Sequence, residues 1–264
     1  MPSVSNIAVG ALVAGSAASK ARHGMNESIA RLSTGMRSMY GGDAAGQSVA
    51  NTLQARSMSW AVAARNAEDG ISAAQTAESA LLEIASIAQR LRELGIQQDN
   101  NALQSSTNDT AALNTEAALL YDQIDAIVSG ATFNGVNLLA SGGKTHSIGV
   151  TDTGGTVTLA TSTTLTSVAA HTLAAGADGT ADVTLKEVAL SLGSVAAGIS
   201  SLKARQAVAY SASANLAAAA ARIEDTDFAK ETANLTKNSV LNQSAMAMVA
   251  QANQAQSAIL AVLQ

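Results

Sequence analysis

The apolar residues at the start of the chain recur at steps of three and four. They are Val4, Ile7, Ala11, Ala14, Ala18, Ala21, Met25, Ile29 and Leu32. This spacing places them on one face of a helix. The helical pattern weakens at Ser33-Thr34-Gly35 and is interrupted by Gly41-Gly42. Asp43 can then accept the free N–H groups of a new first turn, which predicts a second helix.

The second helix is predicted over residues 44–98, and a third begins near Thr110. The apolar stripe of the second helix consists of Ile71, Ala74, Ala77, Leu81, Ile84, Ala88, Leu91 and Leu94. The stripe of the third consists of Leu113, Ala117, Leu120, Ile124 and Ile127, with Asp109 as the expected cap. Residues 99–109 between them are loop-like. The Asn-Gly pair in Phe133-Asn134-Gly135 tolerates positive φ and predicts a turn.

A single hairpin carries the β signal of the chain. His146, Ile148 and Val150 alternate with polar or small residues, Asp152-Thr153-Gly154-Gly155 can turn, and Val157 and Leu159 alternate on the way back. Period-two alternation on both sides of a turn is typical of a β hairpin. Residues 161–182 are rich in Ser, Thr, Ala and Gly, and we expect them to be exposed loop.

The next helix shows the most regular heptad pattern in the chain. Its positions are Leu185, Val188, Leu192, Val195, Ile199, Leu202, Gln206, Ala209, Ser213, Leu216, Ala220 and Ile223. Steps of three and four sustained over this length predict a coiled-coil interface. The segment 224–227 (Glu-Asp-Thr-Asp) breaks and recaps the helix. A final helix to Gln264 carries Ala245, Val249, Ala252, Ile259 and Leu263.

Composition favours long helices that pack closely. Aromatic residues make up only 2% of the chain, alanine dominates the apolar positions, and the single proline is Pro2. Alanine has the best helix propensity but offers little surface to bury. We predict a mainly α fold: a long antiparallel coiled-coil or bundle rod built from both terminal arms, with a small β-hairpin insert. We also expect the terminal arms to stay largely disordered until neighbouring copies cover them.

Charge and residue chemistry exclude several classes of function. The net charge is −5, so nothing steers the chain toward nucleic acid or an anionic membrane, and the absence of cysteine excludes disulfides and thiolate metal sites. No stretch looks long and apolar enough to span a bilayer. Residues 7–18 could mimic a signal peptide, but no Lys or Arg precedes them, so we expect no cleaved signal.

No constellation of residues indicates an enzyme. The three histidines are scattered, no HExxH motif occurs, and no Gly-rich loop follows a strand. Asp225 and Asp227 could suggest a calcium ligand pair, but helix capping explains them better. We therefore expect no catalytic residue, no metal and no cofactor.

Several motifs, in order along both arms, resemble bacterial flagellin. They are Arg31-Leu32-Ser33-Thr34-Gly35, Asp43-Ala44-Ala45-Gly46, Arg65-Asn66-Ala67-Glu68-Asp69-Gly70-Ile71-Ser72, Gln89-Arg90-Leu91-Arg92-Glu93-Leu94, Phe133-Asn134-Gly135, Ala221-Arg222-Ile223-Glu224-Asp225-Thr226-Asp227-Phe228 and Gln251-Ala252-Asn253-Gln254. They cover roughly residues 1–140 and 185–264. The stretch after Gly35 is one residue shorter than usual in the family, and the chain ends in Leu-Gln instead of Leu-Arg.

The resemblance implies a structural subunit that polymerises into the helical flagellar filament for swimming motility. It implies an inner domain of residues 1–42 plus 226–264, a helical domain of residues 43–145 plus 183–225, and a variable insert at 146–182. Two alternatives remain. A hook–filament junction protein shares the terminal helices, and a secreted helical translocator or adhesin would need a strongly apolar or basic amphipathic segment.

The resemblance also implies contacts and partners. In flagellins the motif around Arg90 packs against the next subunit and is recognised by host innate receptors. The corresponding residues here are Gln89, Arg90, Leu94 and Glu116; a solvated face with Arg90 paired to Glu93 is the simpler interpretation. The expected assembly residues of the terminal helices are Val4, Ile7, Ala11, Met25, Leu32, Val249, Ala252, Ile259 and Leu263.

Expected partners are other copies of the chain, an export chaperone at the C-terminal helix, and the flagellar cap and hook-associated proteins. A host receptor is a further candidate. The expected location is the extracellular filament.

Overall fold

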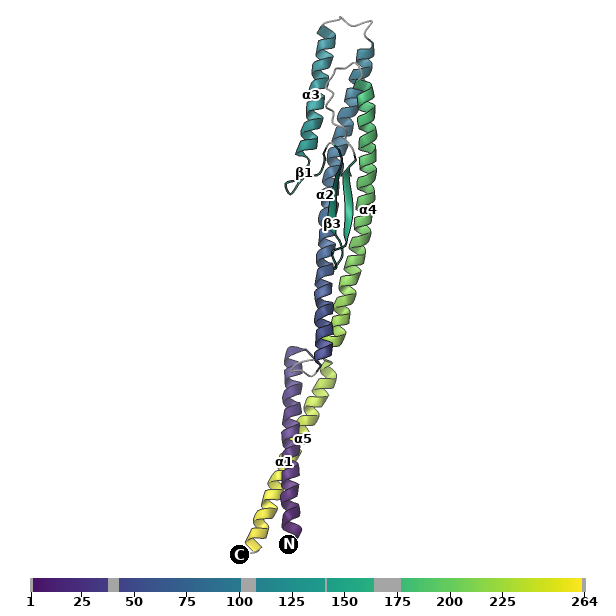
Figure 1. Cartoon of the computed structure of the whole chain (residues 1–264). Helices are drawn as coiled ribbons and strands as arrows, with labels where there is room; N and C mark the ends of the chain where they lie inside the picture. The colour runs from purple at the N-terminus through teal and green to yellow at the C-terminus, as the bar shows by residue number, and fades with distance from the viewer. Residues whose placement is uncertain (1, 38–42, 101–107, 141, 164–176, 263–264) are drawn as a thin grey trace. The chain divides into compact units, whose positions relative to one another are not determined.

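The computed structural model describes residues 2–37, 43–100, 108–140, 142–163 and 177–262. The described part is mainly α, as the sequence predicts (Figure 1). The elements in chain order are α1 (Pro2–Thr34), α2 (Ala44–Asp99), α3 (Asn108–Gly130), β1 (Thr132–Phe133), β2 (Val136–Asn137), β3 (Lys144–Gly149), β4 (Thr156–Ser162), α4 (Ala177–Glu224) and α5 (Phe228–Val262).

The chain divides into two compact units. Unit 1 comprises residues 1–55 and 216–264, and unit 2 comprises residues 56–215. The division falls inside α2 and α4, so each of these helices contributes to both units. The sequence-based domain limits, at 42/43 and 225/226, coincide instead with the connections between helices.

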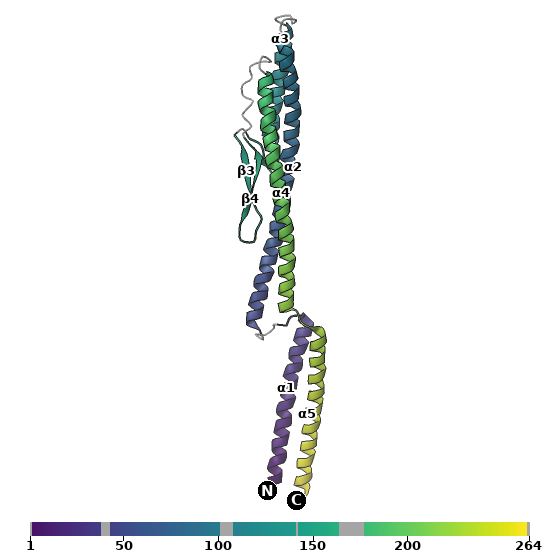
Figure 2. The same cartoon turned by 90° about the vertical axis from the view of Figure 1, so that its right-hand side faces the viewer.

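Unit 1 contains a pair of antiparallel helices. α1 and α5 lie side by side with the two chain termini at the same end (Figures 1 and 2). The predicted stripe of α1 faces into this pair, with Ala18 and Ala21 buried. Ile29 is an exception, because it is 48% exposed and the neighbouring Ser28 is buried in its place. At this turn of α1 the inward position is therefore held by the polar side chain of Ser28.

Backbone hydrogen bonds tie the end of α1 to the start of α5. Gly35 has a φ of 71° and its carbonyl accepts the N–H of Thr226 at 2.8 Å. The N–H of Arg37 donates to the carbonyl of Glu224 at 2.7 Å. Positive φ favours glycine, so Gly35 ends α1 in the usual way for a helix C-terminus.

Aspartates begin both helices that follow this connection. Asp43 Oδ1 accepts the N–H of Gly46 at 2.8 Å, and this bond, with Arg37 beside it, lowers the pKa of the Asp43 carboxyl. Asp227 Oδ1 accepts the N–H groups of Ala229 and Lys230 at 3.0 and 3.1 Å. Both predicted caps are therefore present.

Unit 2 packs α2, α3 and α4 around the large apolar residues of the chain. Leu81, Ile84 and Leu91 of α2 form one core with Ile124 of α3 and Leu202 of α4. Every heptad position predicted for α4 is buried or half-buried. The periodicity therefore identified the packed face of this helix.

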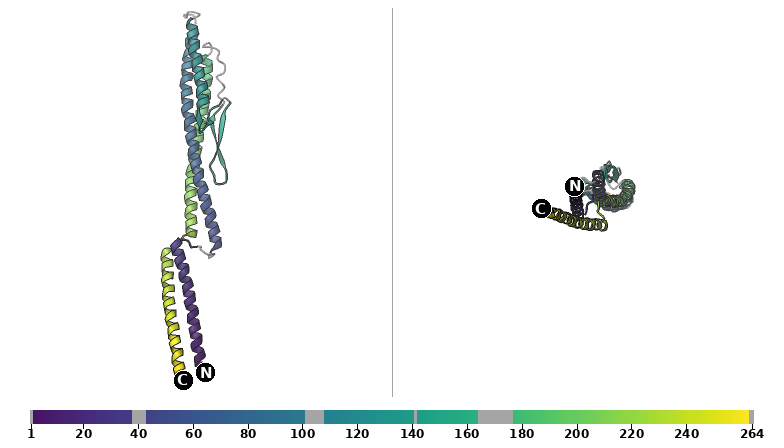
Figure 3. Two further views of the ribbon diagram at one scale, coloured as in Figure 1. Left: turned by 90° about the vertical axis from the view of Figure 1, so that its left-hand side faces the viewer. Right: turned by 90° about the horizontal axis from the view of Figure 1, so that it is seen from below.

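Two antiparallel hairpins complete unit 2. β1 and β2 are joined by Asn134 and Gly135, whose φ values of 49° and 77° are those of the predicted Asn-Gly turn. The predicted second hairpin is present, and in its register His146 pairs with Leu159 and Ile148 with Val157. The β3–β4 hairpin lies along one side of the helices (Figures 2 and 3).

Arginines of α2 connect this helix to each of its neighbours in unit 2. Arg56 pairs with Asp152 of the hairpin turn at 2.8 Å, Arg90 with Glu116 of α3 at 2.7 Å, and Arg92 with Asp182 of α4 at 2.8 Å. The three guanidinium groups are about half exposed. Such surface pairs contribute little stability each, but they fix how the elements are oriented.

Three expectations about element limits need correction. α3 begins at Asn108, so Asp109 lies in its first turn and does not precede it. α4 begins at Ala177, within the segment expected to be loop, and Ala177 and Ala181 are buried. Thr161 and Ser162 are also buried, whereas composition suggested exposure. Thr161 Oγ1 donates to the carbonyl of Leu138 at 2.5 Å, which satisfies the buried hydroxyl.

One helix is long and apolar enough to cross a membrane by length and composition, contrary to the sequence-based expectation. It is α4, found in a search of the described residues. Core helices pass the same test, and Val188, Val195 and Leu202 of α4 face the core of unit 2. Packing in unit 2 covers only part of this apolar surface, because 28% of the apolar window of α4 is buried.

Candidate assembly surfaces

The predicted contact residues around Arg90 meet on the surface of unit 2. Arg90 Nη2 and Nε both donate to Glu116 Oε1, at 2.7 and 3.0 Å, and Nη1 donates to Glu93 Oε2 at 3.0 Å. These carboxylates, Glu116 first, raise the pKa of Arg90. The local Arg90–Glu93 pair expected from sequence and the bridge to α3 are thus both present. Gln89 lies beside them, exposed.

Leu94 differs from the other three predicted residues. Its side chain is 0% exposed and belongs to the core of unit 2. It therefore does not reach the surface that carries Gln89, Arg90 and Glu116. Its step of three from Leu91, which is also buried, already assigned it to the inner stripe of α2.

Sequence reasoning missed three exposed apolar residues on the outer faces of the same helices. Leu82 is 55% exposed, Ile96 53% and Leu119 64%. Leu82 and Ile96 lie seven residues to either side of Gln89, and therefore on its face of α2; Leu119 follows Glu116 by three residues on α3. We call Leu82, Gln89, Arg90, Ile96, Glu116 and Leu119 the Arg90 surface.

The predicted assembly residues of the terminal helices are partly covered within the chain. Ala11, Met25 and Leu32 of α1 and Val249 and Ala252 of α5 are half-buried. Val4, Ile7, Ile259 and Leu263 lie outside the residues whose side chains the structure describes. The predicted stripe of α1 therefore belongs to the face turned toward its partner helix.

Large apolar residues of both terminal helices are exposed in unit 1. On α1, Val9, Leu12 and Val13 are 53%, 75% and 61% exposed. The exposed apolar residues of α5 are Phe228, Val240, Leu241, Met246 and Met248. These eight residues are spread along both helices and lie on more than one side of α5; we refer to them together as the uncovered terminal face. Exposed apolar side chains of this size are candidates for contact with other proteins.

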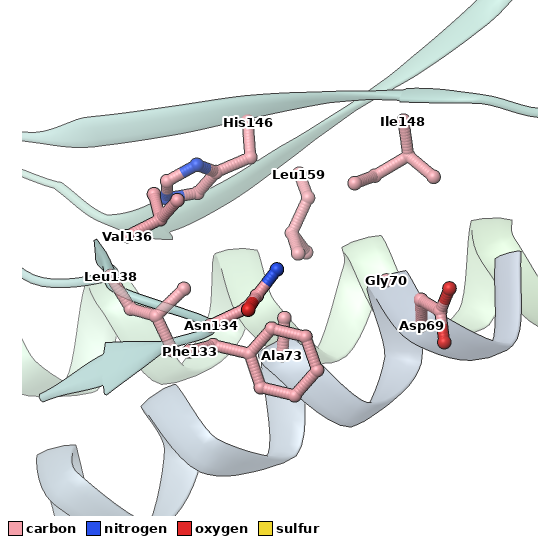
Figure 4. A pocket seen from close by; sticks show the side chains of 10 residues that line it. All are labelled: Asp69, Gly70, Ala73, Phe133, Asn134, Val136, Leu138, His146, Ile148 and Leu159. Atoms are coloured by element: carbon pink, nitrogen blue, oxygen red, sulfur yellow. The ribbon is translucent and has the colours of Figure 1, made fainter. Parts of the chain in front are cut away.

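An apolar cavity of about 500 Å³ lies in unit 2 between α2 and the two hairpins (Figure 4). Its wall includes Ala73, Phe133, Ile148 and Leu159. The Nε2 atom of His146 is buried here without a hydrogen-bond partner among the described residues. Burial, followed by the charge of Lys144, lowers the pKa of His146.

Within the described residues, no group of three or more His, Cys, Asp or Glu side chains is arranged to hold a metal ion. Asp227, one of the two candidate calcium ligands, caps α5 with its carboxylate. The Arg90 surface and the uncovered terminal face both offer exposed side chains for contact with another macromolecule.

Family models match both arms of the chain. The model described as the bacterial flagellin N-terminal helical region matches residues 6–144, and the model of the bacterial flagellin C-terminal helical region matches residues 179–263. The stretch between the two matches contains most of the β3–β4 hairpin.

Curated relatives match nearly the whole length. The "Flagellin" of Halalkalibacterium halodurans is 36% identical over 249 residues, covering 90% of this chain and 91% of the relative. The "Flagellin" of Bacillus subtilis is 32% identical, with 90% and 92% covered, as is the "Flagellar filament 33 kDa core protein" of Treponema phagedenis. Among solved structures, Bacillus cereus flagellin is similar at 25% identity and a TM-score of 0.40, covering 58% of this chain and 88% of that chain.

Proposed function

The chain belongs to the bacterial flagellin family and is a structural subunit of the bacterial flagellar filament, and we propose that its copies join through the uncovered terminal face. The observation that carries this proposal is the exposure of large apolar side chains on both helices of unit 1. Leu12 is 75% exposed and Met248 is 60% exposed. Covering such side chains with a neighbouring copy removes apolar surface from water, which favours association.

The Arg90 surface is proposed as a second contact between copies. Its exposed apolar residues Leu82, Ile96 and Leu119 lie on the same two helices as the Arg90–Glu116 pair. Exposed apolar side chains together with an arginine that is already held by its own carboxylates suit a protein contact, because the arginine needs no new counter-ion when it is covered. Recognition of the free subunit by a host innate receptor would use the same exposed residues.

Further partners follow from the family and remain proposals. An export chaperone would cover exposed apolar side chains of α5, such as Met246 and Met248. The cap and hook-associated proteins would meet subunits at the two ends of a filament. Export without a cleaved signal is likewise a proposal that follows from the family. We also propose that residues 1–42 plus 226–264 form an inner domain and that residues 43–145 plus 183–225 form a helical domain. We propose no catalytic activity for either domain.

The alternatives gain no support. Both matching models are flagellin regions, which does not favour a hook–filament junction protein. A translocator or adhesin would need a strongly apolar or basic amphipathic segment; α4 is apolar enough by length and composition, but both matching models are flagellin regions and do not favour this function.

Seeded growth tests the proposed role of the terminal face. Purified subunits are added to filament fragments, and filament length is measured by electron microscopy. We expect Leu12→Asp to reduce the elongation rate by at least about tenfold, because a carboxylate would have to be desolvated at the contact. Leu12→Met keeps the apolar side chain and should elongate like the parent. Normal growth of Leu12→Asp filaments would contradict the proposal.

A further inference from the structure

The contact between α1 and α5 contains little that could fix one alignment of the two helices. The buried apolar residues described in the two helices are Ala18, Ala21 and Ala245. Small side chains allow close approach, but alanine facing alanine is nearly the same after a shift of one turn. A shift of one turn moves one helix along the other by about 5.4 Å. Alanine packing alone therefore does not determine the register.

A buried carboxylate can fix the register that alanine packing leaves undetermined. Glu231 of α5 is 7% exposed, and its Oε1 atom lies 3.7 Å from Nη1 of Arg31 on α1. Its Oε2 atom accepts a hydrogen bond from Asn234 Nδ2 at 3.4 Å. A buried carboxylate is costly unless a cation and hydrogen-bond donors accompany it. A shift by one turn would leave Glu231 buried without Arg31.

Close contact between the helices occurs in the same alignment. A Cβ atom at Gly24 of α1 would lie 2.6 Å from Nδ2 of Asn238 on α5, so in this alignment the movable Asn238 side chain packs directly onto the glycine. On the other side of the Arg31–Glu231 pair, Gly35 and Thr226 are joined by a backbone hydrogen bond. The charged pair thus lies between two contacts that are made in this register.

We infer that Glu231 and Arg31 are positioning residues that select the helix α5 of the same chain, in one register, as the partner of α1. The inference rests on the proposed function, because only an assembly that brings together terminal helices from many copies offers competing partners. A single buried polar group is known to specify register and partner in helix pairs at some cost in stability.

Cysteine cross-linking tests the inference cleanly, because the chain contains no cysteine of its own. Copies carrying Gly24→Cys and copies carrying Asn238→Cys are mixed, polymerised on seeds and oxidised. Pairing within each chain leaves no disulfide-linked dimer, whereas exchange of α5 between chains produces one. With Glu231→Gln in both copies, we expect the dimer fraction to rise about tenfold or more. A single chain with both cysteines should cross-link internally.

Glu27→Gln is the matched control. Glu27 also contacts Arg31, at 2.5 Å, but it lies on α1 itself and cannot choose a partner for that helix. It should leave the dimer fraction unchanged. If Glu231→Gln prevents assembly, exchanging the charges with Arg31→Glu and Glu231→Arg should restore both assembly and pairing within the chain.

Equal dimer fractions from parent copies and from copies carrying Glu231→Gln would overturn the inference, as would an exchanged-charge variant that fails to restore assembly. Failure of the proposed function gives a different result. In that case Leu12→Asp subunits elongate filaments normally, whatever the cross-linking pattern.

Discussion

The Nε2 atom of His146 is buried beside the apolar cavity and has no hydrogen-bond partner among the described residues. A buried imidazole without a partner is tolerated more easily when it is neutral than when it is charged. Burial accordingly lowers the pKa of His146 in the folded chain. Asp69 of α2 and Lys144 of β3 are the charged groups near it.

This pKa shift makes the stability of unit 2 depend on pH. As the pH falls, the unfolded chain binds a proton at His146 before the folded chain does. Stability from this group is therefore complete above its unfolded pKa of about 6.5 and declines as the pH falls from there toward the lowered folded value. Urea unfolding at several pH values should show this decline, and His146→Gln should make it smaller. An unchanged decline in that variant would show that other groups cause it.

Gly95 of α2 lies directly against the backbone of α4. A Cβ atom at this position of α2 would clash with the backbone nitrogen of Asp178 in α4 and lie 3.0 Å from the Cα atom of the same residue. Backbone cannot move aside as a flexible side chain can. We expect Gly95→Ala to lower the free energy of unfolding by about 1–3 kcal/mol, measured by urea denaturation.

Gly193 of α4 provides the comparison for Gly95. Nothing lies within 4 Å of a Cβ atom built there, among the residues that the structure describes. Gly193→Ala should therefore raise the free energy of unfolding by about 0.5–1 kcal/mol, as alanine does inside an exposed helix. Stabilisation by both substitutions would mean that the approach of α4 to Gly95 is looser than described.

At the scale of elements, α4 shows what a regular pattern can predict. Its large heptad residues, such as Val188, Val195 and Leu202, are buried in the core of unit 2. α5 has no such single face of large buried residues, because its apolar residues occur on more than one face and most are small or exposed. We therefore expect the same substitution to act differently in the two helices.

Leu202→Asp should destabilise the free subunit by about 4 kcal/mol or more, because it places an unpaired charge where Leu202 is 0% exposed. Val249→Asp in α5 should leave the melting of the free subunit nearly unchanged and block polymerisation. Calorimetry of monomers together with seeded growth measures both effects. Equal losses of melting temperature in the two variants would refute this division between the helices.

The elements themselves were predictable where large and small residues alternate clearly. The presence of the β3–β4 hairpin and of the Asn134-Gly135 turn follows from local chemistry alone. The start of α4 did not, because Asp178-Gly179 is typical of a loop and the helix there is held by packing of Ala177 and Ala181. Burial of Thr161 was equally hidden, since its partner is the distant carbonyl of Leu138.

The candidate surfaces were predictable only in part. Arg90 and Glu116 were assigned by resemblance, and their direct contact required knowing how α3 returns along α2. The uncovered terminal face was missed because a single helical stripe was sought in α1. A helix with apolar residues on two faces can pair within the chain through one and leave residues such as Leu12 for a neighbour.

The two units of the molecule differ in what they bury. The largest fully buried side chains, Leu81, Ile84 and Leu202 among them, all lie in unit 2. The described apolar residues buried in unit 1 are alanines: Ala18, Ala21, Ala50, Ala220 and Ala245. Burial of alanine offsets little of the conformational entropy lost on folding. Unit 1 should therefore be much less stable than unit 2 in a free subunit.

Limited proteolysis of the dilute monomer checks this expectation. A fragment close to residues 56–215 should resist cleavage while both ends are removed. Circular dichroism should show a gain of helix on polymerisation, because the terminal helices fold when neighbours cover them. A monomer that is already fully helical and protease-resistant at both ends would contradict the expectation.

The arginine pairs on the surface of unit 2 carry a direction as well as a charge. The cations joining α2 to α3, α4 and the hairpin turn are the guanidinium groups of Arg90, Arg92 and Arg56. Arg90 reaches Glu116 through two nitrogens, a fork that the single ammonium group of a lysine cannot reproduce. Replacing Arg90 with lysine would thus keep the positive charge and lose the geometry of the contact.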